Sequence, residues 1–537
     1  MEERKKTYIA KQKAMLGQGG MSRRQFIMSM LAAGVALPAA MSMAGNVLAA
    51  TPKKGGKFRH GTAYGSTTDS LDPATYENGF MAGTAGLYLN YLAAVDNDGE
   101  LKPDLAESYE SSDAKTWVFK LRKGIEFHNG KTMTADDVIA SLNYHRGESS
   151  KSAAKGLMKQ VKEMKKDDDH TLVFELEGAN ADFPFVVSDY HLGILPGTDG
   201  KIDPTSGIGT GGYAIEKFEA GVRTIGKRNP NYFKSNRAHF DEVEIISIID
   251  VTARQNAIMS GDVDHIDRVD PKTVALLARA PTLNILETTG TQHYTFPMRL
   301  DTEPFGNADL RMALKLAIKR QELVDKILLG HGAIGNDHPI SVSNQYHNGD
   351  LAQREYDPEK AAHHYKKSGH SGSISLSASD AAFAGAVDAA QLIKASAADA
   401  GITIDVVREP SDGYWSNVWN KKGWCACYWG GRPTEDWMFS AAYIDSTEWN
   451  DTAWKTTDAA KKFNGIVVQA RAELDPAKRR TLYAECQQLV SDDGGAIVPM
   501  WANYIHASAK KVAHDEKVAG NWENDGNRAA ERWWFNS

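Results

Sequence analysis

Residues 207–212 carry the first chemical signature in the chain, because their glycines fit the G-x-G-x-x-G spacing of a dinucleotide-binding loop. Such a loop must lead into a helix, since the pyrophosphate binds at the helix N-terminus. The next six residues, 213–218, instead alternate apolar and polar side chains as a strand does. The sequence therefore predicts a glycine-rich turn before a strand and no nucleotide site.

Histidines are the other residues whose type suggests chemistry. His363 and His364 are adjacent on an expected helix, where neighbouring side chains point about 100° apart, so they do not form the i,i+4 pair of a zinc site. His331 and His338 are scattered, and H-E-x-x-H, G-x-S-x-G, P-loop and paired C-x-x-C motifs are absent from the sequence. We expect no catalytic residue, no metal site and no cofactor.

The chain has three cysteines, and two of them lie close together. Cys425 and Cys427 are two apart in an apolar run, so on a strand they would share one face. That spacing is too short for an unstrained disulfide. We expect buried thiols.

The first fifty residues have the pattern of an export leader. Residues 22–27, Ser-Arg-Arg-Gln-Phe-Ile, precede an apolar stretch rich in alanine and methionine, which is typical of a twin-arginine signal. Polar residues, glycine and proline interrupt the stretch, and it ends in small residues near Ala50, which favours a cleaved signal over an uncleaved membrane anchor. No cysteine stands at the expected cleavage point. The sequence thus predicts a protein free in a bacterial periplasm without a lipid anchor, with Met21 as an alternative start.

Composition indicates a large acidic protein. The leader carries a net charge of +5, so the formal charge of −7 for the whole chain becomes −12 for the rest. Such an acidic chain is a poor candidate for binding nucleic acid or anionic lipid. The roughly 487 residues after the leader exceed what one core usually holds, so we expect two or more lobes.

Short strands and amphipathic helices follow one another, so we predict a mixed α/β class. Residues 116–122 alternate as a half-buried strand, and Thr134 begins a helix. Apolar spacing predicts one helix from Asn307 to about Gly330, and Asp475 followed by Pro476 begins another. A further helix over 382–400 and a strand over 402–407 are predicted.

The order of several short motifs resembles that of the bacterial extracellular solute-binding proteins of family 5, which feed peptides, opines, nickel chelates and related solutes to ABC importers. The matching segments span nearly the whole mature chain. They are residues 71–73 (L-D-P), 105–108 (L-A-E-S), 117–130 (W-x-F-x-L-R-x-G-x-x-F-H-N-G), 134–138 (T-A-x-D-V), 209–213 (G-T-G-G-Y), 228–232 (R-N-P-N-Y), 304–305 (P-F) with 311–314 (R-x-A-L), and 356–361 (Y-D-P-E-K-A).

The resemblance implies a two-lobed periplasmic binding fold of type II, whose chain crosses a hinge twice. We expect the crossings near residues 299–301 and 500–501. Residues 51–299 with 501–537 would then form lobe 1, and residues 300–500 lobe 2. A monomer is expected to bind a small peptide-like or opine-like solute in the interlobe cleft and to pass it to ABC permease and ATPase subunits. The alternatives are a secreted cofactor-containing enzyme and a binding protein for a metal chelate.

The resemblance places the best ligand-binding candidates, Trp429, Gly430, Arg432 and Asp436, in residues 427–436. Peptide-binding relatives tend to have an acid for the ligand's α-amino group where this chain has Arg432. A guanidinium pairs bidentately with a carboxylate or phosphate and repels an ammonium, so we predict a ligand with an acidic group. Two alternatives stay open: Arg432 forms a rim salt bridge with Glu435 or Asp436, or one of these acids binds an amine.

Asp380 lies where dipeptide binders place an arginine for the peptide carboxylate. We therefore predict a swapped arrangement, in which Arg432 meets an acid and Asp380 a cationic or hydroxylated end of the solute. Aromatic rings provide rigid walls and can hold a cation. Tyr64 and Trp429 are the preferred walls, and further candidates are Trp415, Trp454, His293 and Phe296.

Overall fold

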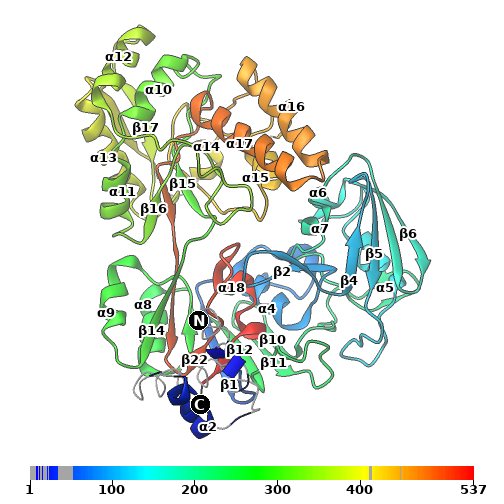
Figure 1. Ribbon diagram of the computed structural model, residues 1–537. Helices are drawn as coiled ribbons and strands as arrows, with labels where there is room; N and C mark the ends of the chain where they lie inside the picture. The colour runs from blue at the N-terminus through cyan, green and yellow to red at the C-terminus, as the bar shows by residue number, and fades with distance from the viewer. Residues whose placement is uncertain are drawn as a thin grey trace.

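The computed structural model describes residues 8–9, 11–12, 15, 21, 23–33, 35, 52–410, 414–447 and 449–536. Its three largest sheets occupy three regions of a mixed α/β molecule (Figure 1): seven strands at the bottom, four at the right and four at the top. The first two sheets build the lower lobe and the third builds the upper lobe. The predicted class and two-lobed fold are confirmed.

The seven-stranded sheet is the centre of the lower lobe, and its strand order is β10-β11-β12-β1-β13-β21-β14. Strands β1, β12 and β13 run parallel, whereas the other neighbours are antiparallel. The strands are β1 (Lys57–Thr62), β10 (Tyr213–Glu219), β11 (Arg223–Arg228), β12 (Glu242–Ser247), β13 (His265–Ile266), β14 (Leu283–Thr288) and β21 (Tyr504–Ala509). With them lie α4 (Gly79–Tyr88), α8 (Val251–Ser260), α9 (Val274–Ala278), α18 (Glu523–Asn527), α19 (Ala529–Arg532) and the pair β22 (Val512–Ala513) and β23 (Trp534–Phe535).

The glycine-rich turn of residues 207–212 packs against the end of α4. A Cβ atom at Gly209 would lie 2.0 Å from the carbonyl oxygen of Tyr88, and one at Gly211 would lie 2.5 Å from that of Leu87. Strand β10 then follows, as the alternation predicted. These glycines permit close backbone contact.

The right-hand unit is an antiparallel sheet of order β4-β5-β7-β6. Strand β5 buries Trp117, Phe119 and Leu121, in agreement with the alternation read from the sequence. Thr134 and Asp137 form the capping box that begins α5. The elements are β4 (Ala106–Glu110), β5 (Thr116–Leu121), β6 (Val161–Asp168), β7 (Thr171–Leu176), α5 (Ala135–Tyr144), α6 (Lys155–Met158) and α7 (Phe183–Val186), with the pairs β2 (Ala93–Val95) and β3 (Leu101–Pro103), and β8 (Gly197–Thr198) and β9 (Lys201–Ile202).

The upper lobe contains a sheet of order β16-β20-β15-β19 and a parallel pair, β17 and β18. Its strands are β15 (His293–Thr295), β16 (Gly332–Ile334), β17 (Ile374–Ala378), β18 (Ile404–Arg408), β19 (Cys427–Trp429) and β20 (Met500–Ala502). Its helices are α10 (Ala308–Leu316), α11 (Arg320–Ile327), α12 (Pro358–Ser368), α13 (Ala386–Ala398), α14 (Tyr414–Asn417), α15 (Glu435–Ala442), α16 (Asp458–Ala472) and α17 (Pro476–Asp492). Asp475 caps α17 through Ala477 N and Lys478 N, as predicted.

One predicted helix is wrong, because the segment after Asn307 forms two helices, α10 and α11. The chain leaves helical geometry at Ala317 and at Lys319, which has ψ 81°. The Arg320 side chain donates a hydrogen bond to the Lys315 carbonyl at 3.0 Å, which satisfies an acceptor that a continuous helix would have bonded internally. The apolar periodicity continues across the break and hides it in the sequence.

The chain passes between the two large sheets at two places. Strand β14 ends at Thr288 in the lower sheet and β15 begins at His293 in the upper one, whereas β20 and β21 are separated by Asn503 alone. We therefore propose hinge crossings at residues 289–292 and at Asn503, in place of 299–301 and 500–501. The lobe boundaries move accordingly and remain a proposal.

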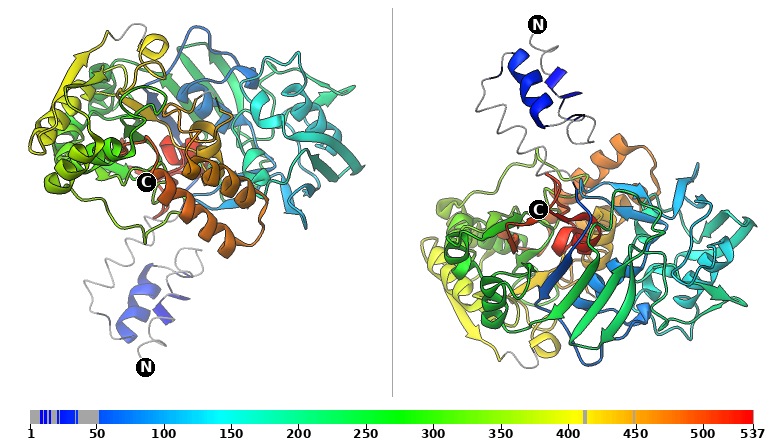
Figure 2. Two further views of the ribbon diagram at one scale, coloured as in Figure 1. Left: turned by 90° about the horizontal axis from the view of Figure 1, so that it is seen from above. Right: turned by 90° about the horizontal axis from the view of Figure 1, so that it is seen from below.

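Helix α2 (Arg23–Ala32) belongs to the expected leader and projects from the body of the molecule (Figure 2). It buries Phe26 and Met30 against neighbours from the same region. Most of the predicted signal, including Ser22 and the cleavage point near Ala50, lies outside the described residues. Within the described part of the chain, no helix combines the length and apolarity needed to span a membrane.

Candidate functional site

The carboxyl ends of β1 and β13 meet at the edge of the lower sheet that faces the upper lobe. Because the two strands are parallel, the residues that follow them, Tyr64 and Arg268, lie side by side. Asp267 fixes this junction, since it accepts hydrogen bonds from Thr62 Oγ1 at 2.6 Å and Ala63 N at 2.7 Å. The carboxyl ends of a parallel strand pair thus position the floor of a candidate site.

Three side chains form this floor. Tyr64 donates a hydrogen bond to Glu523 Oε2 at 2.9 Å, and Arg268 Nε lies 3.2 Å from Glu523 Oε1. The Arg268 guanidinium also stands 5.2 Å from the centre of the Tyr64 ring. Burial would lower the pKa of Arg268, but Glu523, Tyr64 and Asp267 raise it above its ordinary value. Burial raises the pKa of Glu523, which Arg268 opposes.

Aromatic side chains of the upper lobe form a cluster, and one of them, Tyr294, lines the same cavity as Arg268 and Glu523 of the floor. Tyr294 on β15 and Tyr428 on β19 are register partners and therefore share one face of the sheet. Phe383 stacks on Tyr294 with ring centres 4.0 Å apart, and Trp415 meets Tyr428 edge-on at 5.6 Å. The charge of Arg268 acts on the Tyr294 hydroxyl, whose pKa burial raises. We call Tyr294, Phe383, Trp415 and Tyr428 the aromatic shelf.

Arg432 follows β19 and lies half-buried beside the cleft. Its Nη1 donates to the carbonyl oxygens of Gly430 at 2.8 Å and Gly431 at 3.2 Å. Burial lowers the pKa of Arg432, whereas Tyr190 and Asp189 of the lower lobe act to raise it. No carboxylate lies within 4.0 Å of its guanidinium among the residues that the structure describes.

The two acids expected to bind Arg432 or an amine have other partners. Asp436 is buried and lies 2.9 Å from Arg471 Nε, and Glu435 accepts a hydrogen bond from Tyr346 N at 2.7 Å. Burial raises the pKa of Glu435 to about 7 and that of Asp436 to about 6. The rim salt bridge with Arg432 is therefore corrected, whereas binding of an amine by one of these acids stays a prediction.

Two further predicted residues lie elsewhere than expected. Trp429 is only 6% exposed, packs with Trp419 and donates Nε1–H to Asp451 at 3.2 Å. Strand alternation gives the shelf position to its neighbour Tyr428, which is 42% exposed. Asp380 is exposed and accepts a hydrogen bond from Gly385 N at 3.1 Å, so it caps the turn before α13.

The remaining predicted walls divide between the shelf and the core. Trp415 is on the shelf and is 40% exposed, and Tyr64 is on the floor. Burial lowers the pKa of His293 to about 4, and Phe296 and Trp454 are fully buried in hydrophobic clusters. Gly431 is required where it meets Thr291, because a Cβ there would lie 1.8 Å from the Thr291 side chain, whereas Gly430 faces open space.

Two cavities lie between the lobes. One of about 380 Å³ is lined by the floor residues Arg268 and Glu523, by Tyr294 of the shelf and by Tyr504. The second, of about 40 Å³, lies between Tyr190 of the lower lobe and Pro433 of the upper lobe. The larger cavity has the size of a small-molecule site, and the smaller one holds a few waters at most.

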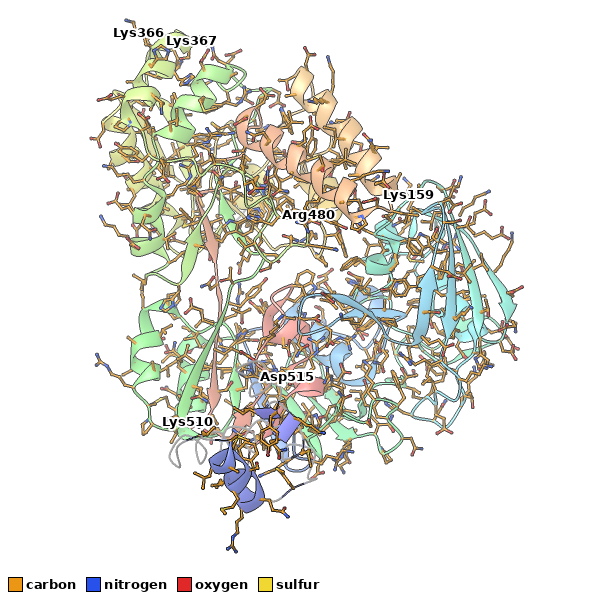
Figure 3. All side chains as sticks on the ribbon, in the orientation of Figure 1. Lys159, Lys366, Lys367, Arg480, Lys510 and Asp515 are labelled. Atoms are coloured by element: carbon orange, nitrogen blue, oxygen red, sulfur yellow. The ribbon has the colours of Figure 1, made fainter. Side chains whose placement is uncertain are left out.

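The lobes also touch away from this cleft. Arg479 Nη2 on α17 lies 2.6 Å from Asp182 Oδ2, which precedes α7, and both side chains are buried. Ala181 N donates to the Arg471 carbonyl at 2.6 Å. Figure 3 shows where this second contact lies. Its label Arg480 is on the lower side of the upper lobe, and its label Lys159 is at the top of the right-hand unit.

Sequence reasoning missed Arg268 and Glu523. Arg268 follows the short strand β13 and Glu523 begins the short helix α18, and a charged residue beside a short element is a weak signal without knowledge of strand order. His364 pairs with Asp309 at 2.8 Å and His363 is exposed, as polar surface residues are. In the part of the chain that the structure describes, no group of three His, Cys, Asp or Glu side chains is arranged to hold a metal, and Cys425, Cys427 and Cys486 are buried free thiols.

Two lobes joined by two crossings, with a cavity between them lined by both, define the class of two-lobed solute-binding proteins. Residues 100–451 match the family model described as bacterial extracellular solute-binding proteins, family 5 Middle. The chain belongs to this family.

Among its relatives, the di/tripeptide-binding protein 1 of Pseudomonas aeruginosa UCBPP-PA14 is 24% identical over 84% of this chain and 90% of its own. Two solved structures share the fold. The binding protein AgaA from A. tumefaciens R10, in complex with agropinic acid, has a TM-score of 0.72 at 22% identity and covers 89% of this chain and 99% of its own. The Helicobacter pylori periplasmic binding protein DppA, in complex with the peptide STSA, has a TM-score of 0.72 at 20% identity and covers 90% of this chain and 99% of its own.

Proposed function

We propose that this chain is the periplasmic solute-binding component of an ABC importer. Its solute is a small peptide-like or opine-like molecule with an acidic group, held in the interlobe cleft. Relatives named for di- and tripeptides, and fold neighbours solved with agropinic acid and with a peptide, support this solute class. The solute would be passed to permease and ATPase subunits, and the binding protein itself would act as a monomer without catalysis.

The observation that carries the proposal is the charge of Arg432. A half-buried guanidinium at the cleft, without a carboxylate partner among the described residues, is costly unless an anion completes it. Tyr294 of the aromatic shelf lines the larger interlobe cavity, and Trp415 and Tyr428 of the shelf are 40% and 42% exposed. A solute that combines an acid with an apolar part satisfies both features.

The finer points of the assignment are part of the same proposal. The arginine pair at residues 23–24 and the weakly apolar stretch after it support export of folded protein by the twin-arginine route. The absence of cysteine near residue 50 supports a chain without a lipid anchor. Of the predicted site residues, we retain Tyr64, Trp415, Gly430 and Arg432 as ligand contacts.

Identification of the bound solute tests the proposal. Native mass spectrometry of freshly purified protein should reveal a co-purifying small molecule, and titration calorimetry should then give its affinity. Losing one partner of a desolvated charge pair costs about 2–5 kcal/mol, so Arg432→Ala should weaken binding by roughly 30-fold to several thousandfold. A loss below about fivefold would return Arg432 to a structural role.

Lobe closure is the second readout. X-ray scattering should give a smaller radius of gyration with solute than without it. An unchanged radius at saturation means that the free protein is already closed or that it lacks a hinge. Arg223→Ala is the control, since Arg223 on β11 pairs with Glu219 on β10 at 2.6 Å, and these strands lie at the opposite edge of the seven-stranded sheet from β21 and β14.

A further inference from the structure

We propose that the lower lobe has a second binding site outside the interlobe cleft, and that its ligand is a small phosphorylated molecule. The site is a cavity of about 400 Å³ beside the hairpin of β2 and β3. Figure 1 shows β2 between α18 and β4. Arg122, Lys234 and Arg237 would bind the phosphate group. The inference does not depend on the solute that binds in the cleft.

The cavity is separate from the interlobe cleft. All of the described residues that line it belong to the lower lobe, and none of them also lines the larger interlobe cavity. Only Ala94, Val95 and Arg528 line the smaller interlobe cavity as well. A ligand in this cavity would therefore leave the cleft open to its own solute. The lining comes from residues 94–96 and 102–104 of the hairpin, Arg122, residues 233–237 after β11, and Arg528, Glu531 and Arg532 at α19.

Basic side chains outnumber carboxylates on the wall of this cavity. Of the described residues that line it, six are basic and three are acidic. The whole chain has the opposite balance, with a formal charge of −7. A positive cavity in an acidic protein attracts and concentrates small anions. The basic residues are Lys102, Arg122, Lys234, Arg237, Arg528 and Arg532, and the acidic residues are Asp96, Asp104 and Glu531.

Acids outside the wall neutralise two of the six basic residues. Lys102 pairs with Glu100 and, at 3.4 Å, with Asp98. Arg532 donates a hydrogen bond to Asp525 Oδ1 at 2.9 Å. Within 4.0 Å, the other four basic residues have only the three carboxylates of the wall as acidic neighbours in the described part of the chain. One positive charge of the wall is therefore left uncompensated.

Lys234 is held at the wall by two buried carboxylates. Its Nζ lies 2.7 Å from Asp104 Oδ1 and 2.9 Å from Glu531 Oε1. Burial would raise the pKa of Glu531, but Lys234 and Arg528 hold it well below its ordinary value, so this glutamate is charged. An ammonium has three donors, and the two carboxylates occupy two of them. The third can donate to a ligand, since the Lys234 side chain is 23% exposed.

Arg122 carries the uncompensated charge. Its Nε donates to the Asp104 carbonyl at 2.7 Å, and Asp104 also holds Lys234. Among the described residues, no acceptor lies within hydrogen-bonding distance of the terminal nitrogens of Arg122. These two nitrogens can donate in parallel to phosphate oxygens. Arg237 adds a second guanidinium, which is 17% exposed and pairs with Asp96 at 3.2 Å.

The number of donors and the size of the cavity determine the ligand class. A phosphate group has three terminal oxygens and up to two negative charges, and the wall offers donors from three cationic side chains. A carboxylate has two oxygens and would leave one of these side chains without a ligand contact. The volume lies within the range of small-molecule pockets and exceeds the need of a free ion. A small phosphate ester is therefore the ligand that fits best.

Titration calorimetry with glycerol 3-phosphate on the full chain tests this site. We expect one molecule to bind per chain, and glycerol, which lacks the phosphate, not to bind. Arg122→Gln should weaken binding by at least about tenfold and Arg237→Gln by at least about threefold, because each substitution removes a charge-assisted contact. Arg122→Lys keeps the charge without the planar fork and should lie between Arg122→Gln and wild type. Arg237→Gln provides the test if loss of the Asp104 contact unfolds Arg122→Gln.

Three controls locate the bound anion. Arg432→Ala should bind glycerol 3-phosphate as wild type does, because Arg432 is not part of this cavity. Arg223→Gln is the matched control for Arg237→Gln, since Arg223 is 39% exposed and also pairs with an acid, and it should change no affinity. Cosedimentation with phosphatidylglycerol vesicles separates a soluble ester from a lipid headgroup. We expect no binding to the vesicles, because the chain as a whole is acidic.

Four results would overturn the second site. They are failure of glycerol 3-phosphate to bind, affinities of both glutamine variants within about twofold of wild type, loss of binding in Arg432→Ala, and binding to vesicles without binding to the free ester. Loss of binding in Arg432→Ala would place the anion in the cleft and so support the proposed function. The other three results leave the proposed function intact, since none of them concerns the solute of the cleft.

Discussion

Asp182 and Arg479 join the two lobes away from the cleft, and the pair should hold the closed conformation. The side chains are 6% and 7% exposed and lie 2.6 Å apart. Asp182→Ala removes the contact without loss of a helix cap, because the Asp182 side chain makes no capping hydrogen bond to α7. In an open conformation the two groups would be separated and solvated, so the substitution acts on the closed form alone.

The free-energy cost of Asp182→Ala to the closed form depends on the hydrogen bonds that Arg479 keeps. Its guanidinium still donates to the Ala470 carbonyl at 3.2 Å and to Tyr483 at 3.3 Å, both within the upper lobe. Removing one partner of a buried pair costs about 3–5 kcal/mol when the other is stranded, so we expect about 2–3 kcal/mol here. That corresponds to a shift of the open–closed equilibrium by roughly 30-fold to 150-fold toward the open form.

Scattering and calorimetry measure this shift. Asp182→Ala should enlarge the radius of gyration of the ligand-free protein if the free protein is closed. If the free protein is already open, the same variant should instead weaken solute binding by the factor above. Asp182→Asn, which keeps the shape of the side chain, should give an intermediate effect.

Asp399→Ala is the control for the same substitution. Its pair with Lys319, at 3.0 Å, lies within the upper lobe and is about half exposed, so neither radius nor affinity should change. If Asp182→Ala left the radius of gyration unchanged and the affinity within a factor of two of the wild-type value, the pair would contribute nothing to closure and the reasoning would be refuted.

Three other expectations concern export, pH and the hinge. Arg23→Lys with Arg24→Lys should leave the precursor in the cytoplasm, which cell fractionation detects; full export would contradict the leader assignment. Burial raises the pKa of Glu435 from 4.5 to about 7, so between these values the folded protein retains a proton that the unfolded chain has lost, and stability falls as pH rises. Glu435→Gln should therefore match wild type near pH 4 and exceed its unfolding free energy by up to about 3 kcal/mol at pH 8, and parallel pH profiles would argue against this. Gly431→Ala should destabilise the protein by about 1–3 kcal/mol through overpacking, whereas Gly430→Ala should shift the melting temperature little, and equal effects would show that the hinge contact can relax.

Local signals in the sequence were sufficient for much of the fold. The capping box at Thr134, the Asp475–Pro476 helix start and the alternation of residues 213–218 each depend on neighbours a few positions away, and each is confirmed. The motif order likewise indicated the family before any contact was known. The break between α10 and α11 could not be predicted, because the apolar spacing continues across it and the hydrogen bond from the Arg320 side chain to the Lys315 carbonyl has no local signal in the sequence.

The site depended on contacts between distant segments. Which face of β19 meets the cleft was decided by its pairing with β15, and that pairing placed Tyr428 on the shelf and Trp429 in the core. Arg268 and Glu523 are neighbours because the parallel pair of β1 and β13 ends at the sheet edge where α18 of the C-terminal segment begins. The sequence by itself determined most of the elements and the family, and only the structure showed that neither Glu435 nor Asp436 pairs with Arg432. Only the tertiary structure decided which charges face the solute, because strand order and lobe contacts arise from packing over hundreds of residues.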